Sequence, residues 1–191
     1  MLYPIAKRLF DFISALILCS VASWLILLVG LAVAMTSKGP MLFWSERVGK
    51  NNKNFMMPKF RTMLTTTPNV ATHLLGDANQ YLTPIGSFLR SSSLDELPQL
   101  WCVLTGKMSF VGPRPALYNQ DDLIELRTNL DVSSLIPGIT GYAQINGRDD
   151  LSIDVKVEWD AEYLRQRGFF FDLKILMLTA VRVLQRSGVS H

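Results

Sequence analysis

Two adjacent carboxylates, Asp95 and Glu96, lie in the segment Ser93-Leu-Asp-Glu-Leu-Pro98. A serine followed three residues later by glutamate has the form of a capping box, and proline prefers the first turn of a helix. We therefore expect both carboxylates at a helix N-terminus, where the helix dipole favours their ionised form and a nearby phosphate. An ionised aspartate can attack phosphorus to give an acyl phosphate, and its neighbour can hold Mg²⁺. Taken alone, Asp-Glu here is more typical of a stabilising cap.

Basic residues lie on both sides of this pair in the chain. Lys59 and Arg61 are two residues apart in an alternating sequence, so in a strand they share one face and could form an anion clamp. Arg90 lies just before the carboxylates. Arg114 stands between two prolines, and such a stiff backbone suits bidentate binding of phosphate. Each of these motifs, taken alone, also fits a solvated strand face or a rigid loop with a structural ion pair.

A glycine-rich segment, residues 137–148, ends in the amide of Asn146 and the guanidinium of Arg148. It could cradle phosphates or a nucleotide base, and the alternative is a glycine-rich turn without a ligand. The segment is neither a Walker loop nor a GxGxxG motif, so ATP and NAD binding are unsupported.

Residues 12–35 form an uncharged, mostly apolar run. A straight helix of that length reaches about 36 Å, which is enough to cross the hydrocarbon core of a membrane. Basic residues flank the run on both sides, so the positive-inside rule gives no orientation. One resolution is a re-entrant helix, with Gly30 as the strong breaker and with Ser20 and Ser23 bending the helix through hydrogen bonds to carbonyls. A full span is the alternative.

Composition indicates one domain, or one domain with an anchor: 191 residues, 49% hydrophobic, with a net charge of +3. We predict a membrane anchor at residues 1–37 and a catalytic domain at residues 38–191. Residues 172–186 read as an amphipathic helix, either at the membrane interface or packed on the core. The mild positive charge fits anionic lipids or phosphorylated substrates and does not argue for nucleic acid.

The rest of the chain predicts an α/β fold dominated by helices. Helices are expected at 83–90, 98–104, 121–129 and 155–167. Short strands are expected at 41–45, at 55–64 with an interruption at Pro58, at 109–112 and within 137–147. Residues 65–80 read as a loop with a little helix.

Together these motifs resemble, in order and over nearly the whole chain, the bacterial sugar transferases, also called monotopic phosphoglycosyl transferases. The resemblance rests on the apolar helix, residues 59–63, 90–100, 108–115, 137–148 and 172–190. Each motif is weak alone, whereas the ordered set is specific. The length is similar to that of members with a single catalytic domain, such as the diacetylbacillosamine-1-phosphate transferases of protein glycosylation. One departure is that Ser23 is followed by Trp24, where members often carry a Ser-Pro pair that breaks the re-entrant helix.

The resemblance implies a mechanism. Asp95 would attack the β-phosphate of a UDP-sugar, release UMP and form a phosphosugar-aspartyl intermediate. Undecaprenyl phosphate would then take the phosphosugar and give a polyprenyl-diphospho-sugar. Glu96 would bind Mg²⁺ with help from Asp95, Arg90 and Arg114 would clamp phosphates, and Lys59 would sit near Asp95.

The resemblance also implies a setting. The reaction would be the first membrane step of bacterial glycoconjugate biosynthesis, at the cytoplasmic face of the inner membrane. Membrane lipids would be partners beside the two substrates, and the apolar C-terminal helix could support a homodimer.

Two other classes of function stay open from the residues alone. Paired carboxylates can serve a glycoside hydrolase, although adjacent residues on a helix project about 100° apart, which is awkward for that geometry. A membrane-anchored scaffold without catalysis is the other alternative.

Overall fold

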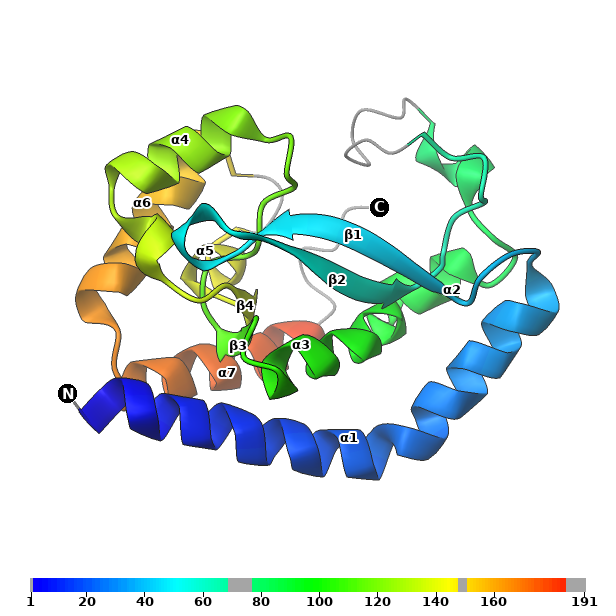
Figure 1. The fold of residues 1–191 in the computed structure, drawn as a ribbon, viewed down its shortest axis with the longest axis horizontal. Helices are drawn as coiled ribbons and strands as arrows, with labels where there is room; N and C mark the ends of the chain where they lie inside the picture. Colours follow the sequence, from blue (N-terminus) through cyan, green and yellow to red (C-terminus); the bar gives the residue numbers. More distant parts are fainter. Residues whose placement is uncertain (1, 69–76, 148–150, 185–191) are drawn as a thin grey trace. The chain divides into compact units, whose positions relative to one another are not determined.

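The computed structural model describes residues 2–68, 77–147 and 151–184. It confirms a helix-dominated α/β class (Figure 1). The chain forms two compact units. The first comprises Met1–Leu16, Glu46–Phe55 and Trp101–His191, and the second comprises Ile17–Ser45 and Met56–Leu100. Each unit is therefore built from several stretches of the chain, and the division predicted at residue 37 stays a prediction.

Helix α1 (Leu2–Thr36) is continuous, and it is long and apolar enough to cross a membrane. Most of its large apolar side chains are exposed, as in Val21 and Leu27, whose exposed fractions are 66% and 73%. The hydroxyl of Ser23 donates to the carbonyl of Ser20 at 2.8 Å, as expected, while Gly30 is buried without interrupting the helix. A helix with so much exposed apolar surface is suited to lipid rather than water.

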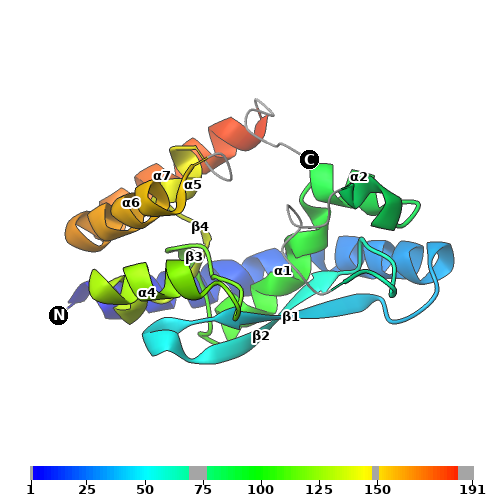
Figure 2. The same ribbon diagram turned by 90° about the horizontal axis from the view of Figure 1, so that it is seen from above.

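The first unit is built on two short parallel strands, β3 (Ser109–Val111) and β4 (Gly138–Thr140), which pair in register from end to end. Helix α7 (Phe169–Leu184) packs on both strands, and helix α5 (Tyr142–Ile145) packs against α7 and against α6 (Ile153–Gln166). In Figure 2, α5 is seen beside both α6 and α7. The buried core consists of Val111, Val132, Leu135, Ile145, Ala161, Tyr163 and Ile175.

Helix α4 (Asp121–Asn129) packs against α6 through a smaller core of Ala116, Leu123 and Val157. Acidic residues in its first turn and Arg127 in its last turn complement the helix dipole. The short 3₁₀ helices η5 (Val132–Ser134) and η1 (Lys50–Asn52) contact one another beside it.

The second unit contains α2 (Gly86–Ser91) and three further short elements. These are η3 (Ala78–Tyr81), η4 (Leu94–Gln99) and the start of α3 (Leu100–Leu104), which continues directly from η4. Its core consists of Val29, Val33, Phe60 and Leu89. The C-terminal half of α1 is thus part of this core, and it supports the segment that carries Asp95.

Strands β1 (Leu42–Val48) and β2 (Asn54–Phe60) form a two-stranded sheet (Figure 1). Each strand contains residues of both units. The predicted strand over 55–64 ends early, and Pro58 lies inside β2 rather than interrupting it. A two-stranded sheet leaves one edge of each strand without a partner strand, where a missing N–H costs nothing.

Some other element boundaries also differ from those predicted. Helix α4 was predicted at both ends, whereas α6 begins two residues early because the Ser152 hydroxyl accepts from the Val155 backbone N–H. Helix α7 begins at Phe169, three residues earlier than expected. Part of the predicted loop at 65–80, and the predicted helix end at Arg186, lie outside the described residues.

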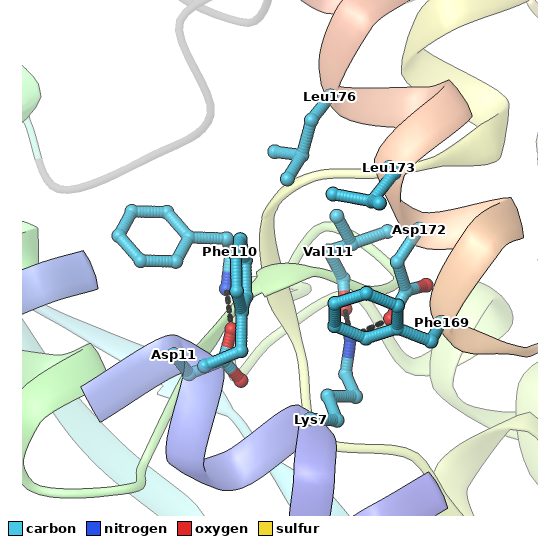
Figure 3. Close-up of a pocket in the computed structure, with 9 residues that line it drawn as sticks. Lys7, Asp11, Phe110, Val111, Phe169, Asp172, Leu173 and Leu176 are labelled. Atoms are coloured by element: carbon cyan, nitrogen blue, oxygen red, sulfur yellow. Dashed lines mark hydrogen bonds and ion pairs between the residues drawn. The ribbon is translucent and has the colours of Figure 1, made fainter. Parts of the chain in front are cut away.

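Side chains from the N-terminal turns of α1 bind backbone groups of β3 on the edge that does not pair with β4 (Figure 3). Lys7 Nζ donates to the carbonyl of Val111 at 2.9 Å and to Asp172 Oδ2 at 2.5 Å, and Asp11 Oδ1 accepts from the backbone N–H of Phe110 at 3.2 Å. The side chains of Lys7 and Asp172 are only 15% and 8% exposed. The pair therefore ties α1 and α7 to the strand that precedes Arg114.

Replacing Lys7 by methionine should destabilise the protein by on the order of 3 kcal/mol, because Asp172 would stay buried without its cation. Thermal unfolding in detergent micelles measures this. Lys174→Met, the same change at an exposed position on α7, is the control. The double change Lys7→Met with Asp172→Leu should recover part of the loss. An unfolding midpoint equal to that of the parent protein would contradict this role.

Candidate active site

Asp95 and Glu96 lie in the first turn of η4, as predicted, but the turn is built differently. Ser93 makes no side-chain capping bond, so the predicted capping box is wrong. Its backbone instead adopts the left-handed region, with φ of 57°, and the Glu96 N–H donates to the Ser93 carbonyl at 3.2 Å. A serine in this region is uncommon, and such backbone conformations cluster at functional sites. Here it turns the chain from α2 into the carboxylates.

Asp95 is a buried carboxylate, with 7% of its surface exposed. Burial raises its pKa above the usual range, and Glu96 adds to this, while the cations of Lys59 and Arg90 oppose it. The net direction is upward, so the expectation that the helix start favours the ionised form is outweighed by desolvation. An aspartate with a perturbed pKa beside specific charged partners is a candidate for chemistry.

Lys59 reaches this segment from β2. Its Nζ lies 2.7 Å from Glu96 Oε1, and the two side chains are 18% and 22% exposed. Of the two cations that lower the pKa of Asp95, Lys59 has the larger effect. Lys59 therefore acts electrostatically on both carboxylates.

Arg90 comes from the last turn of α2, and its Nη2 contacts the sulfur of Met63 at 3.7 Å. Lys59, Arg90, Asp95 and Glu96 thus form one cluster in the second unit. A buried carboxylate with two cations acting on it can attack an electrophile whose leaving group carries negative charge.

Arg61 binds backbone carbonyls rather than forming the anion clamp that we predicted. Its guanidinium is buried and donates to the carbonyls of Lys38, Ser37 and Gly39, just after the end of α1. Those carbonyls lie beyond the last residue of α1, Thr36, where no helical N–H follows to bind them, so the guanidinium supplies their donors. The joint anion clamp of Lys59 and Arg61 does not form, since Lys59 pairs with Glu96.

Arg114 belongs to the first unit and lies in the loop after β3. It is exposed, while Pro113 and Pro115 on either side are buried. Asn146 belongs to the same unit, and its side-chain amide donates to the carbonyl of Tyr142 at 2.8 Å. Arg148 lies outside the described residues.

Backbone packing explains two glycines of the segment 137–148. A Cβ on Gly138 would lie 2.1 Å from the backbone nitrogen of Gly112, and one on Gly141 would lie 2.2 Å from the Gly112 carbonyl oxygen. Only glycine allows this close approach of the two chain segments. The glycines therefore need no ligand to account for them.

The carboxylates of Asp95 and Glu96 can be compared with the ligands that Mg²⁺ needs. In the described ranges, no group of three or more His, Cys, Asp or Glu side chains is gathered as a metal site. Mg²⁺ commonly takes one or two carboxylates and completes its shell with water and substrate phosphates. Asp95 and Glu96 fit that requirement.

Sequence reasoning missed the residues that surround the backbone of Arg114, above all Arg127 and Asp160. A signal for Asp160 exists, because it follows the helical spacing of the buried residues Val157 and Ala161. A charged residue on the buried stripe of a helix indicates a buried ion pair.

Comparison with known proteins identifies the family of this chain. The sequence profile of the family described as "Bacterial sugar transferase" matches residues 2–186. The chain is 42% identical over 189 residues to a protein of Bacillus subtilis (strain 168) named "Uncharacterized sugar transferase EpsL", covering 98% of this chain and 91% of that protein.

Two further relatives carry names that state substrates. One is the "UDP-glucose:undecaprenyl-phosphate glucose-1-phosphate transferase" of Xanthomonas campestris pv. campestris, 38% identical over 95% of this chain and 39% of that protein. The other is the "Undecaprenyl-phosphate galactose phosphotransferase" of Salmonella typhimurium (strain LT2), 34% identical over 95% of this chain and 41% of that protein. This chain spans less than half the length of these two relatives. From the profile and these identities, the chain belongs to the bacterial sugar transferase family.

Proposed function

We propose that this protein is a phosphoglycosyl transferase that moves a sugar 1-phosphate from a UDP-sugar to undecaprenyl phosphate and releases UMP. The observation that carries the proposal is the buried carboxylate of Asp95 with the cations of Lys59 and Arg90 acting on it. The names of two relatives, which pair undecaprenyl phosphate with glucose or galactose, support the same substrates.

The reaction runs in two displacements at one phosphorus. A carboxylate oxygen of Asp95 bonds to the β-phosphorus of the UDP-sugar, the bond to the bridging oxygen breaks, and UMP leaves with that oxygen. A phosphate oxygen of undecaprenyl phosphate then attacks the same phosphorus, and Asp95 leaves as a free carboxylate. Burial of Asp95 supports this route, because an acyl phosphate must be shielded from water between the two steps.

The neighbouring charges have separate tasks. Lys59 and Arg90 favour the ionised, nucleophilic form of Asp95 against its burial. Glu96, with Asp95, would hold Mg²⁺, which when bound neutralises charge on a diphosphate. Lys59 balances Glu96 through their ion pair.

We assign Arg114 to a substrate phosphate, since its exposed guanidinium stands on a backbone stiffened by two prolines. Asn146 and Arg148 are candidates for contacts with the nucleotide. Arg61 is left out of the phosphate contacts, because its N–H groups serve carbonyls at the end of α1.

We further propose that α1 enters the membrane and returns to the same face. Near its start, Lys7 and Asp11 bind β3, and near its end Val29 and Val33 pack with Phe60. A spanning helix would carry these two ends to opposite faces of the bilayer. Basic residues, however, flank the apolar run on both sides, which fits a helix whose two ends face the same, cytoplasmic side.

Helix α7 supports contact with the membrane interface. It buries Ile175 and Asp172 in the first unit, yet leaves Phe170 and Met177 85% and 64% exposed. We propose that this apolar surface lies on lipid at the cytoplasmic face of the bacterial inner membrane, with a homodimer as the alternative use of that surface.

Replacing Lys59 by methionine should move the acid limb of the pH–activity profile to higher pH. Activity needs ionised Asp95 and is lost as the pH falls through its pKa. Lys59 lowers that pKa, so its removal raises it further. The profile of kcat/KM measures this, with Lys53→Met at an exposed position as the control. A limb that stays in place, or moves to lower pH, would contradict the assignment.

Nucleotide release tests the proposed function as a whole. Protein in detergent or nanodiscs is mixed with Mg²⁺, undecaprenyl phosphate and a panel of UDP-sugars, and UMP and UDP are quantified. UMP formed with some of the sugars is the expected result. UDP would mean ordinary glycosyl transfer, free sugar without a lipid acceptor would mean hydrolysis, and neither nucleotide with any sugar would favour the scaffold.

A further inference from the structure

The loop that carries Arg114 is held along its backbone. Four successive carbonyls, those of residues 113–116, each accept a hydrogen bond from a different residue of the first unit. The bonds are Gly138 N to Pro113 O at 2.9 Å, Arg127 Nη1 to Arg114 O at 2.8 Å, Arg47 Nη1 to Pro115 O at 3.2 Å, and Val48 N to Ala116 O at 2.9 Å. Pro113, Pro115 and Ala116 are buried, so their carbonyls need protein donors, and this row of bonds fixes the backbone on both sides of the exposed Arg114.

One of these donors is itself anchored by a buried acid. Arg127 also donates from Nη2 and Nε to Asp160 Oδ2, at 2.6 Å and 3.0 Å. The side chain of Asp160 is 1% exposed, and that of Arg127 is 12% exposed. Asp160 comes from α6 and Arg127 from the last turn of α4, so the guanidinium links two helices to the loop.

The contacts of Arg127 require an arginine rather than a lysine. The planar guanidinium presents several N–H groups in fixed directions, so two can bind Asp160 while a third binds the carbonyl of Arg114. A lysine could supply the charge but not this fork. The arrangement therefore serves the loop as well as the ion pair.

We propose that the Arg127–Asp160 pair is a positioning device that fixes the backbone of Arg114 and so aims its side chain at the substrate phosphate. This inference rests on the proposed function, in which Arg114 contacts a phosphate. Misplacing a substrate-binding group by about 1 Å can cost about 10²-fold in rate, which gives such a device a measurable effect. The competing explanation is a purely structural pair that joins α4 to α6.

A double-mutant cycle separates the two explanations. The positioning device is removed by Arg127→Met with Asp160→Asn, which leaves no unpaired charge in the interior. This change is made in the parent protein and in Arg114→Ala, and transfer of phosphosugar from UDP-glucose or UDP-galactose, whichever is turned over, is measured well below the unfolding temperature. Arg165→Met is the matched control, because it removes another arginine–carboxylate pair from α6 without touching the loop.

The expected result is a loss of kcat/KM of about ten- to a hundredfold in the parent background and of less than about threefold in the Arg114→Ala background. Equal losses in both backgrounds would overturn the positioning role. If the double change does not fold, Arg127→Lys replaces it, since it keeps a cation against Asp160 and loses the fork. Parent-like activity in Arg114→Ala alone would overturn the proposed role of Arg114 itself, and this inference with it.

Discussion

Asp95→Asn should abolish phosphosugar transfer, with a loss on the order of 10⁴-fold or more, because an amide cannot act as the nucleophile. The change alters almost no volume, so substrate binding should survive. UMP release under saturating UDP-sugar measures the loss. Asp131→Asn makes the same chemical change at an exposed position whose left-handed backbone asparagine accepts.

The same substitution should leave the fold at least as stable at neutral pH. Burial raises the pKa of Asp95 in the folded state above its unfolded value. Its contribution to stability is then present at low pH and is lost as the pH rises through the folded pKa. Asparagine stays neutral throughout, so the unfolding midpoint of Asp95→Asn at neutral pH should equal or exceed that of the parent. A marked fall in the midpoint would show that the variant is inactive because it is unfolded.

Arg114→Ala should lower kcat/KM by about 10²–10³-fold, the usual effect of removing a preorganised donor to a charged transition state. Arg114→Lys should recover only part of this, since lysine keeps the charge and loses bidentate geometry. Arg165→Ala, at an exposed arginine on α6, should leave activity unchanged.

The separate effects of Arg114→Ala on KM and on kcat show how Arg114 acts. A loss confined to KM would mean that Arg114 binds substrate and transition state equally, whereas a loss in kcat places its effect in the transition state. Activity within about twofold of the parent would contradict any contact with a phosphate.

Local signals in the sequence predicted those parts of the fold that depend on local structure. Helix α4 was predicted at both ends, because acidic residues open it and Arg127 closes it. The carboxylates were correctly placed in the first turn of a helix. The capping box failed because Ser93 takes a left-handed backbone, a choice made by the packing of α2 and η4 rather than by the pattern of residue types.

Long-range pairings could not be predicted in this way. Arg61 and Lys59 share a motif, yet one binds carbonyls at the end of α1 and the other binds Glu96. The direction in which the pKa of Asp95 shifts depends on burial, which the tertiary structure decides. Here burial raises this pKa more than the position at the helix start lowers it. The Arg127–Asp160 pair joins residues 33 positions apart, and only the stripe of buried residues on α6 hinted at it.

A covalent bond between Asp95 and the phosphosugar defines the proposed mechanism, and trapping that bond is its most direct test. Protein is mixed with Mg²⁺ and the active UDP-sugar carrying a radioactive β-phosphorus, without undecaprenyl phosphate, then quenched and separated from small molecules. The expected result is label on the protein together with free UMP. Undecaprenyl phosphate should chase this label into lipid, and Asp95→Asn should carry none. An unlabelled protein that still forms labelled lipid once undecaprenyl phosphate is added would contradict it and indicate direct transfer between the two substrates.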